Sequence, residues 1–174
     1  MISQGQTQLL LSRKQLMLVI KRLAHQLLEE VAIGEDLVVI GIQPRGVFIS
    51  DELVKEMRAL PGRDVTYGKL DITFYRDDFR KEIHTANETD ITFSIEDKNV
   101  VLVDDVLYTG RTIRAALEAL VDFGRPRSVK LCTLVNRRYN REFPIQPDYC
   151  GLAIDTNVSQ KVKVLPESFE VVMY

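Results

Sequence analysis

Cysteine and histidine are scarce in this sequence, and their scarcity argues against several kinds of protein. Cys132 and Cys150 are the only cysteines, and they lack the CxxC spacing of a zinc or redox site, so we expect free thiols in a reducing compartment. His25 and His84 do not have the spacing of metal ligands, which argues against a structural zinc site. Nothing beyond the presence of the residue types supports a Ser–His–Asp or Cys–His hydrolase.

Long apolar runs and an excess of one charge are also missing. No stretch approaches the roughly 20 residues that cross a bilayer. The first residues lack the basic segment and apolar run of a signal peptide, so we expect a soluble, cytoplasmic protein. The formal net charge is -2. A protein that binds nucleic acid over its whole surface would be basic, so an RNA-binding role would need a local patch.

Two apolar patterns alternate along the chain, which at 174 residues suits one domain spanning residues 1–174. Short continuous apolar runs are typical of buried parallel strands, and apolar residues at helical spacing follow them. The alternation predicts an α/β fold, a mainly parallel twisted sheet flanked by helices, with ligands beyond the carboxyl ends of the strands. We expect strands at 36–42, 65–74, 99–103 and 128–135, helices at 12–33 (opened by a Ser12–Gln15 capping box), 47–60 and 113–123, and short β segments after residue 149.

One block combines acceptors for sugar hydroxyls with donors for a phosphate. Asp104 and Asp105 follow the apolar residues 100–103, and two adjacent carboxylates are costly without a partner because like charges raise each other's pKa. Thr109 and Gly110 then lead into a helix, whose first N–H groups and partial positive charge favour a phosphate. The spacing predicts a site that holds a ribose 5-phosphate at both ends.

Either half of this block alone is not specific. An acidic pair after a strand also occurs in response-regulator pockets, and a Thr-Gly turn can simply begin a helix. A nucleotide P-loop is excluded because no GxxxxGK[ST] occurs. The contiguous block, VVLVDDVLYTGRT at residues 100–112, resembles the phosphoribosyl pyrophosphate motif of the type I phosphoribosyltransferases.

Further segments resemble one family of that superfamily, the pyrimidine-operon attenuator proteins with uracil phosphoribosyltransferase activity (the PyrR family). They are LDITFYRDD at residues 70–78, the run from 101 to 126 that ends in ALVDFGRP, and the residues at 144–145 and 148–151. The resemblance implies a type I phosphoribosyltransferase fold with a small β-rich hood at residues 149–174. It also implies that the polar residues 75–91 form a lid over the site.

The resemblance implies that uracil and phosphoribosyl pyrophosphate react to UMP and diphosphate, with Mg²⁺ held through the diphosphate and no metal held by the protein alone. It assigns catalytic roles to Asp104, Asp105, Arg45 and Arg76. Asp104 and Asp105 would take the ribose hydroxyls, and Arg45 would neutralise the departing diphosphate. The implied substrate contacts are Pro44, Arg45, Gly46, Asp104, Asp105, Val106, Leu107, Tyr108, Thr109, Gly110, Arg111, Thr112, Arg137 and Val162.

The sequence departs from the family pattern at several positions. The family usually has threonine where this chain has Pro44 and aspartate where it has Asn136. Val158 stands in place of a lysine in the hood. Leu18 and Glu30 occupy positions where basic residues are common.

The family also senses UMP or UTP and binds pyrimidine-operon leader RNA, and it forms dimers and higher assemblies. The resemblance therefore implies a homodimer or larger homo-oligomer. It places the RNA-binding face at Lys21, Arg22, His25 and Arg141. Two alternatives remain: a UMP-sensing RNA-binding attenuator with little enzyme activity, and a phosphoribosyltransferase for another base.

Overall fold

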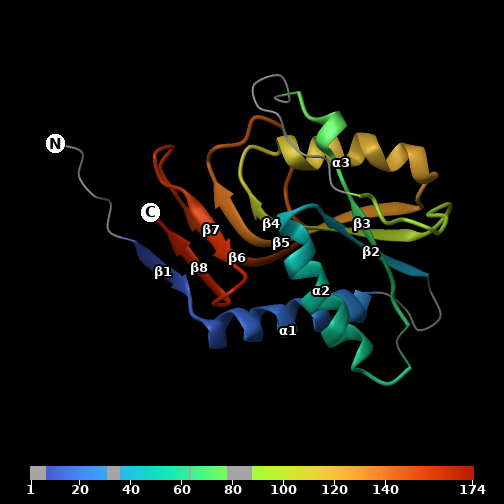
Figure 1. Ribbon diagram of the computed structural model, residues 1–174, viewed down its shortest axis with the longest axis horizontal. Coiled ribbons are helices and arrows are strands. Elements are labelled where there is room, and N and C mark those ends of the chain that lie inside the picture. Colours follow the sequence, from blue (N-terminus) through green and yellow to red (C-terminus); the bar gives the residue numbers. More distant parts are fainter. Residues whose placement is uncertain (1–6, 31–35, 63, 78–87) are drawn as a thin grey trace.

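The computed structural model describes residues 7–30, 36–62, 64–77 and 88–174. A five-stranded sheet with the order β3-β2-β4-β5-β6 forms the centre of the molecule, and all neighbouring strands in it are parallel (Figure 1). The predicted α/β fold with a parallel sheet is confirmed. The strands are β2 (Leu37–Ile42), β3 (Thr66–Leu70), β4 (Asn99–Leu107), β5 (Ser128–Arg138) and β6 (Tyr149–Asp155).

Helices cover both faces of this sheet, as a parallel sheet requires. α1 (Arg13–Glu30) and α2 (Arg45–Arg58) pack together on one face, and α3 (Arg111–Leu120) lies on the other (Figure 1). Alternate residues of β4 serve the two faces: Val101 and Val103 belong to the core under α1 and α2, and Leu102 belongs to the core under α3.

The predicted capping box at the start of α1 is confirmed. The Ser12 backbone N–H donates to Gln15 Oε1 at 2.9 Å, and the Gln15 N–H reaches Ser12 Oγ at 3.5 Å. The predicted end of this helix at residue 33 lies outside the described residues. The predicted lid falls there in part as well, because residues 78–87 are not among those described.

Several predicted strand ends are wrong. β4 runs to Leu107 and so contains Asp104 and Asp105, because β5 continues alongside it and pairs as far as Asn136. β5 continues to Arg138, where β6 is its partner. β3 is shorter than expected: it ends at Leu70, and Thr73–Tyr75 forms a 3-10 turn instead.

A second, antiparallel sheet has the order β1-β8-β7, with β1 at Gln8–Leu11, β7 at Val162–Leu165 and β8 at Glu170–Met173. This sheet is the expected hood, with two corrections. β6 belongs to the parallel sheet, and β1 joins the hood from the start of the chain (Figure 1). β1 is only four residues long, and the strand that supplies its hydrogen bonds is far away in the sequence.

Gly46 sets how closely α2 approaches β4. A Cβ atom at this position would lie 2.4 Å from the Val103 carbonyl oxygen and 3.1 Å from the Asp104 Cα. Gly46→Ala is therefore expected to lower the free energy of unfolding by about 1–3 kcal/mol, because backbone must move to relieve the overlap. Urea unfolding checks this. Gly62→Asn is the control, because its site is open and asparagine tolerates a positive φ; equal losses in both variants would contradict the argument.

Candidate active site

A cavity of about 520 Å³ lies beyond the carboxyl ends of β4 and β5, against the hood. It brings together most of the predicted site residues: Arg45, Arg76, Asp104, the seven residues 106–112, Arg137 and Val162. Pro44, Gly46 and Asp105 do not line it. Pro44 is exposed at the start of α2, and Gly46 is buried against β4.

The side chains of Asp104 and Asp105 point to opposite faces of the sheet. Asp104 and Asp105 are only 5% and 3% exposed, and only Asp104 lines the cavity. Burial, and next the charge of Asp105, raise the pKa of Asp104 well above its ordinary value. Because neighbouring residues of a strand point to opposite faces, Asp105 points toward α2, where Arg45 Nε lies 3.8 Å from its Oδ2.

One oxygen of this pair has no hydrogen-bond partner among the described residues. Asp104 Oδ1 accepts the Asp105 N–H at 2.9 Å, and Asp105 Oδ1 accepts the Val106 N–H at 2.7 Å. Asp105 Oδ2 is buried and accepts no hydrogen bond from the part of the chain that the structure describes. A buried carboxylate oxygen without a donor is costly, and Arg45, whose side chain is 67% exposed, is a weak partner at its distance. This oxygen lies on the α2 side of β4 and is not part of the cavity lining.

The turn between β4 and α3 has its carbonyl groups fixed on one side. The Arg141 guanidinium donates to the carbonyl oxygens of Leu107 and Tyr108. The N–H groups of Glu142 and Phe143 donate to the Thr109 carbonyl at 2.9 and 3.1 Å. In a trans peptide the next N–H points opposite to the carbonyl, so the N–H groups of residues 108–110 point away from these donors.

Gly110 completes this turn as the N-cap of α3, with a φ of 92° that favours glycine. A Cβ atom there would lie 3.3 Å from the Phe143 Cβ, so the residue also allows the loop to pack closely. Consecutive N–H groups that point one way, followed by a helix start, form a site suited to a phosphate.

Arg137 is fixed in the cavity wall and is not a solvated loop charge. Its guanidinium donates to Thr156 Oγ1 and to the carbonyl oxygens of Asn157 and Gln160, at 2.8–3.2 Å, and lies 3.8 Å from the centre of the Tyr108 ring. Burial lowers the pKa of Arg137, whose residue is 5% exposed. The sequence-based expectation placed Arg137 just past the strand, whereas it lies inside β5 and presents a positioned cation to the cavity.

Arg111, at the first turn of α3, connects the cavity with the start of the predicted lid. It forms ion pairs with Asp77 at 2.6 Å and with Glu142, and these two carboxylates, Glu142 first, raise its pKa. Nearby, Arg114 donates to the Tyr75 carbonyl at 3.0 Å. Residues 75–77, at the start of the predicted lid, are thereby attached to α3, and Arg76 lines the cavity.

Four lining residues were not among the predicted contacts: Glu142, Lys161, Lys163 and Tyr174. From Lys161 into β7, the buried Val162 and Val164 alternate with the exposed Lys161 and Lys163. The pattern KVKV therefore contained a usable signal, because a half-buried strand turns alternate residues toward solvent.

The residues predicted to face RNA do not lie together. Lys21, Arg22 and His25 are exposed on α1, and Arg22 also donates to the Gly151 carbonyl at 2.6 Å. Arg141 is half-buried beside the turn that joins β4 to α3, which we call the phosphate turn (residues 107–110). The N–H groups of Arg141 donate to carbonyl oxygens and to Asn136. We therefore leave Arg141 out of any RNA-binding face, because contact with RNA would require these bonds to break.

The described residues contain neither a metal-binding cluster nor a membrane span. None of the groups of histidine, cysteine, aspartate and glutamate among them reaches three members placed to hold a metal ion. In the same residues, none of the helices is long and apolar enough to cross a membrane. Both cysteines are free, and burial raises the pKa of the Cys132 thiol to about 12.

Comparisons with known proteins agree with this geometry. The phosphoribosyl transferase domain family matches residues 6–169. The bifunctional protein PyrR of Limosilactobacillus fermentum is 46% identical over 153 residues, covering 86% of this chain and 85% of the relative. The bifunctional protein PyrR of Bacillus subtilis is 41% identical over 166 residues, covering 92% and 90%.

A solved structure of the hypoxanthine phosphoribosyltransferase of Trypanosoma cruzi shares the fold, with a TM-score of 0.72, coverage of 95% of both chains and 18% identity. At that identity the likeness shows the fold alone. The relatives at 41–46% identity show the family as well as the fold, since they cover most of the chain. The chain belongs to the PyrR family of phosphoribosyltransferases.

Proposed function

We propose that this protein transfers the phosphoribosyl group of phosphoribosyl pyrophosphate to uracil, producing UMP and diphosphate. The observation that carries the proposal is a single cavity that combines a phosphate-type turn, a buried carboxylate and several positioned cations. Membership of the PyrR family supports uracil as the base. The base is not specified by the turn itself, which would suit any ribose 5-phosphate.

Each part of the cavity has a role in this reaction. The N–H groups of residues 108–110 and the start of α3 hold the 5-phosphate. Asp104 accepts hydrogen bonds from the ribose hydroxyls, and Arg45 and Arg76 neutralise charge on the departing diphosphate. These groups position the substrates and stabilise charge, which is most of what this substitution requires of the protein.

Magnesium fits this site as part of the substrate. The described residues include no cluster of three or more histidine, cysteine, aspartate or glutamate side chains placed to hold a metal ion, so the diphosphate oxygens would supply most of its ligands. The cavity-lining carboxylate of Asp104 is a hard oxygen donor of the type that Mg²⁺ prefers, whereas the buried Asp105 Oδ2 faces α2 and Arg45. When bound, the ion neutralises charge on the leaving diphosphate.

The proposal is tested by incubating the purified chain with phosphoribosyl pyrophosphate, Mg²⁺ and one base at a time. We expect UMP from uracil, and little product from orotate, hypoxanthine or guanine. Formation of a purine nucleotide or of orotidine monophosphate without UMP would establish a phosphoribosyltransferase for another base. Loss of uracil turnover on chelation of Mg²⁺, restored by its return, would support the role of the ion.

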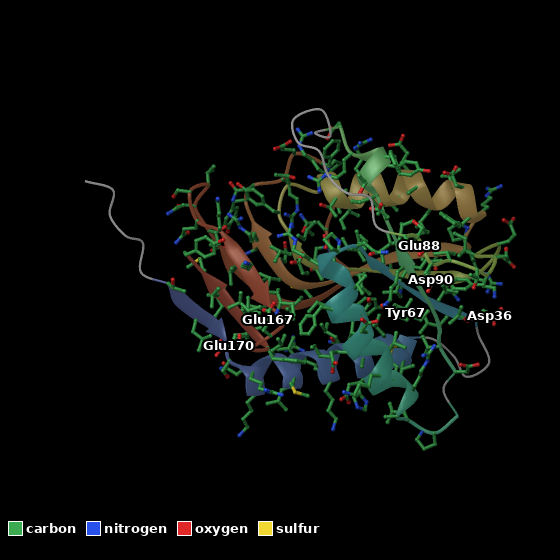
Figure 2. The ribbon with its side chains drawn as sticks, in the orientation of Figure 1. Asp36, Tyr67, Glu88, Asp90, Glu167 and Glu170 are labelled. Carbon is green, nitrogen blue, oxygen red and sulfur yellow. The ribbon has the colours of Figure 1, made fainter. Side chains whose placement is uncertain are left out.

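A second activity, UMP-dependent binding of pyrimidine-operon leader RNA, is favoured by the exposed Lys21, Arg22 and His25 on α1. The PyrR relatives are named bifunctional proteins. Figure 2 shows Asp36, Glu88 and Asp90 at the β2–β3 side of the molecule, a region that would repel phosphates. An RNA-binding face on α1 would use Lys21, Arg22 and His25, whose side chains are exposed there.

Lys21→Ala combined with His25→Ala is expected to weaken binding of a purine-rich hairpin RNA at least tenfold, because phosphate contacts supply much of RNA affinity. A gel-shift titration with and without UMP measures this. Lys55→Ala on α2 is the control, since Lys55 is exposed and lies 3.5 Å from Glu52. RNA binding that ignores UMP, or that all three substitutions leave unchanged, would count against this second activity.

We also propose that the protein is at least a homodimer, as its family implies, and that it works in the cytoplasm. Sedimentation of the purified chain tests the first point. A monomer at micromolar concentration would contradict it. Neither point affects the assignment of the cavity.

A further inference from the structure

Arg141 carries a half-buried positive charge that no carboxylate among the described residues neutralises. Its guanidinium donates to five oxygen atoms, all of them neutral. Within the described ranges, Arg141 forms no ion pair, and the nearby Glu142 is paired with Arg111 instead. Burial lowers the pKa of Arg141. The five acceptors are the carbonyl oxygens of Leu107, Tyr108, Arg137 and Ile145 and the side-chain Oδ1 of Asn136.

The location of this charge gives it a role. Two of its acceptors are the carbonyl groups of Leu107 and Tyr108, the first peptides of the phosphate turn. Fixing these carbonyls behind the turn directs the N–H groups of residues 108 and 109 the opposite way. Arg141 therefore both orients the donors of the turn and places a positive charge behind them.

The side chain at position 136 determines whether the positive charge of Arg141 acts on a ligand at the phosphate turn. An amide at this position, 7% exposed, accepts from Arg141 without cancelling its charge. A carboxylate of the same shape would neutralise the guanidinium through a buried ion pair.

We propose that Arg141 is a positioning residue for the phosphate turn and that the neutral Asn136 makes the turn bind phosphate monoesters more tightly than an aspartate would. The inference rests on the proposed function, because it concerns the same turn. It extends that function by identifying a pair, outside the cavity lining, that sets how tightly the 5-phosphate of the substrate or of UMP is held.

The test is Asn136→Asp, because truncation of Arg141 would release four carbonyl groups and could unfold the protein. Affinities for UMP and uridine are compared by calorimetry, since the two ligands differ only in the phosphate. We expect Asn136→Asp to weaken UMP about five- to tenfold and uridine less than twofold, because the new carboxylate neutralises the charge behind the turn. The thermal midpoint should stay level or rise, since the fold gains an ion pair.

Gln146→Glu is the matched control, because Gln146 is exposed in the segment between β5 and β6 that also holds Arg141, and the substitution adds the same charge. It should leave both affinities unchanged. A merely structural role for Arg141 predicts no selective effect on UMP. Unchanged UMP affinity in Asn136→Asp, or equal losses for UMP and uridine, would overturn the inference.

Uracil turnover by the native chain separates this inference from the proposed function. Turnover with an Asn136→Asp variant that binds UMP normally would overturn the inference alone. A selective loss of UMP affinity without any uracil turnover in the native chain would support the inference and overturn the proposed function. Native protein that binds neither UMP nor inorganic phosphate would overturn both.

Discussion

Arg45→Met should lower kcat for UMP formation by about 100- to 1000-fold, the usual effect of removing a group that stabilises charge in the transition state. The Arg45 side chain is 67% exposed, and its ion pair with Asp105 is long, with 3.8 Å between Nε and Oδ2. Little of the fold therefore depends on Arg45. Charge on the leaving diphosphate develops as the bond to C1 breaks. We therefore expect kcat to fall and the KM for uracil to stay nearly unchanged.

Steady-state kinetics with both substrates varied, together with a thermal melt, checks this prediction. Arg45→Lys is the conservative partner, and it should recover part of the rate because it keeps the charge but loses the bidentate geometry. A methionine variant with normal kcat would remove Arg45 from the mechanism. A large drop in the thermal midpoint would show instead that the residue is structural.

Asp104→Asn should weaken binding of phosphoribosyl pyrophosphate by about 1.5–3 kcal/mol, since a charged acceptor for the ribose hydroxyls is lost. The amide can still accept the Asp105 N–H, so the local backbone is preserved. Calorimetry measures the loss. Asp105→Asn is the comparison: only Asp104 lines the cavity, so a larger effect at Asp105 would contradict this assignment.

The same substitution should stabilise the fold at neutral and alkaline pH. The pKa of Asp104 is raised by burial and by Asp105, so the carboxyl group holds its proton more tightly in the folded protein than in the unfolded chain. The stability that this provides is fully present below the unfolded pKa of about 3.9 and is lost as pH rises through the folded pKa.

The thermal midpoint of Asp104→Asn should therefore exceed that of the native protein by an amount that grows between pH 4 and pH 8. A control variant should change the charge at a site without this burial. Gln146→Glu is suitable, since its side chain is exposed and no raised pKa is expected there. A midpoint difference that is constant with pH would contradict the pKa shift of Asp104.

The sequence predicted the elements whose signals are local. Apolar runs located β2, β4 and β5, and a capping box located the start of α1. The ends of β4 and β5 could not be predicted because polar residues there, Asp104 among them, find backbone partners on a neighbouring strand. Propensity describes each segment alone, and the neighbouring strand decides where pairing stops.

The site shows the same division. The block from Asp104 to Thr112 could be recognised because its residues are contiguous, and most of them line the cavity. The role of Arg141 could not be recognised, since its acceptors on the phosphate turn lie more than 30 residues away in the sequence. A basic residue in a basic segment is typical of an RNA-binding surface, and only the fold shows that its charge is turned inward.

The antiparallel sheet made by β1, β7 and β8 has a consequence for the order of folding. It pairs Gln8 with Met173, so closing it costs the entropy of a loop made of almost the entire chain. The parallel sheet needs much shorter connections, and contacts of low sequence separation form sooner. The chain should therefore assemble Asp104, Asp105 and the turn between β4 and α3 first, and complete the lysine-bearing wall of the cavity last.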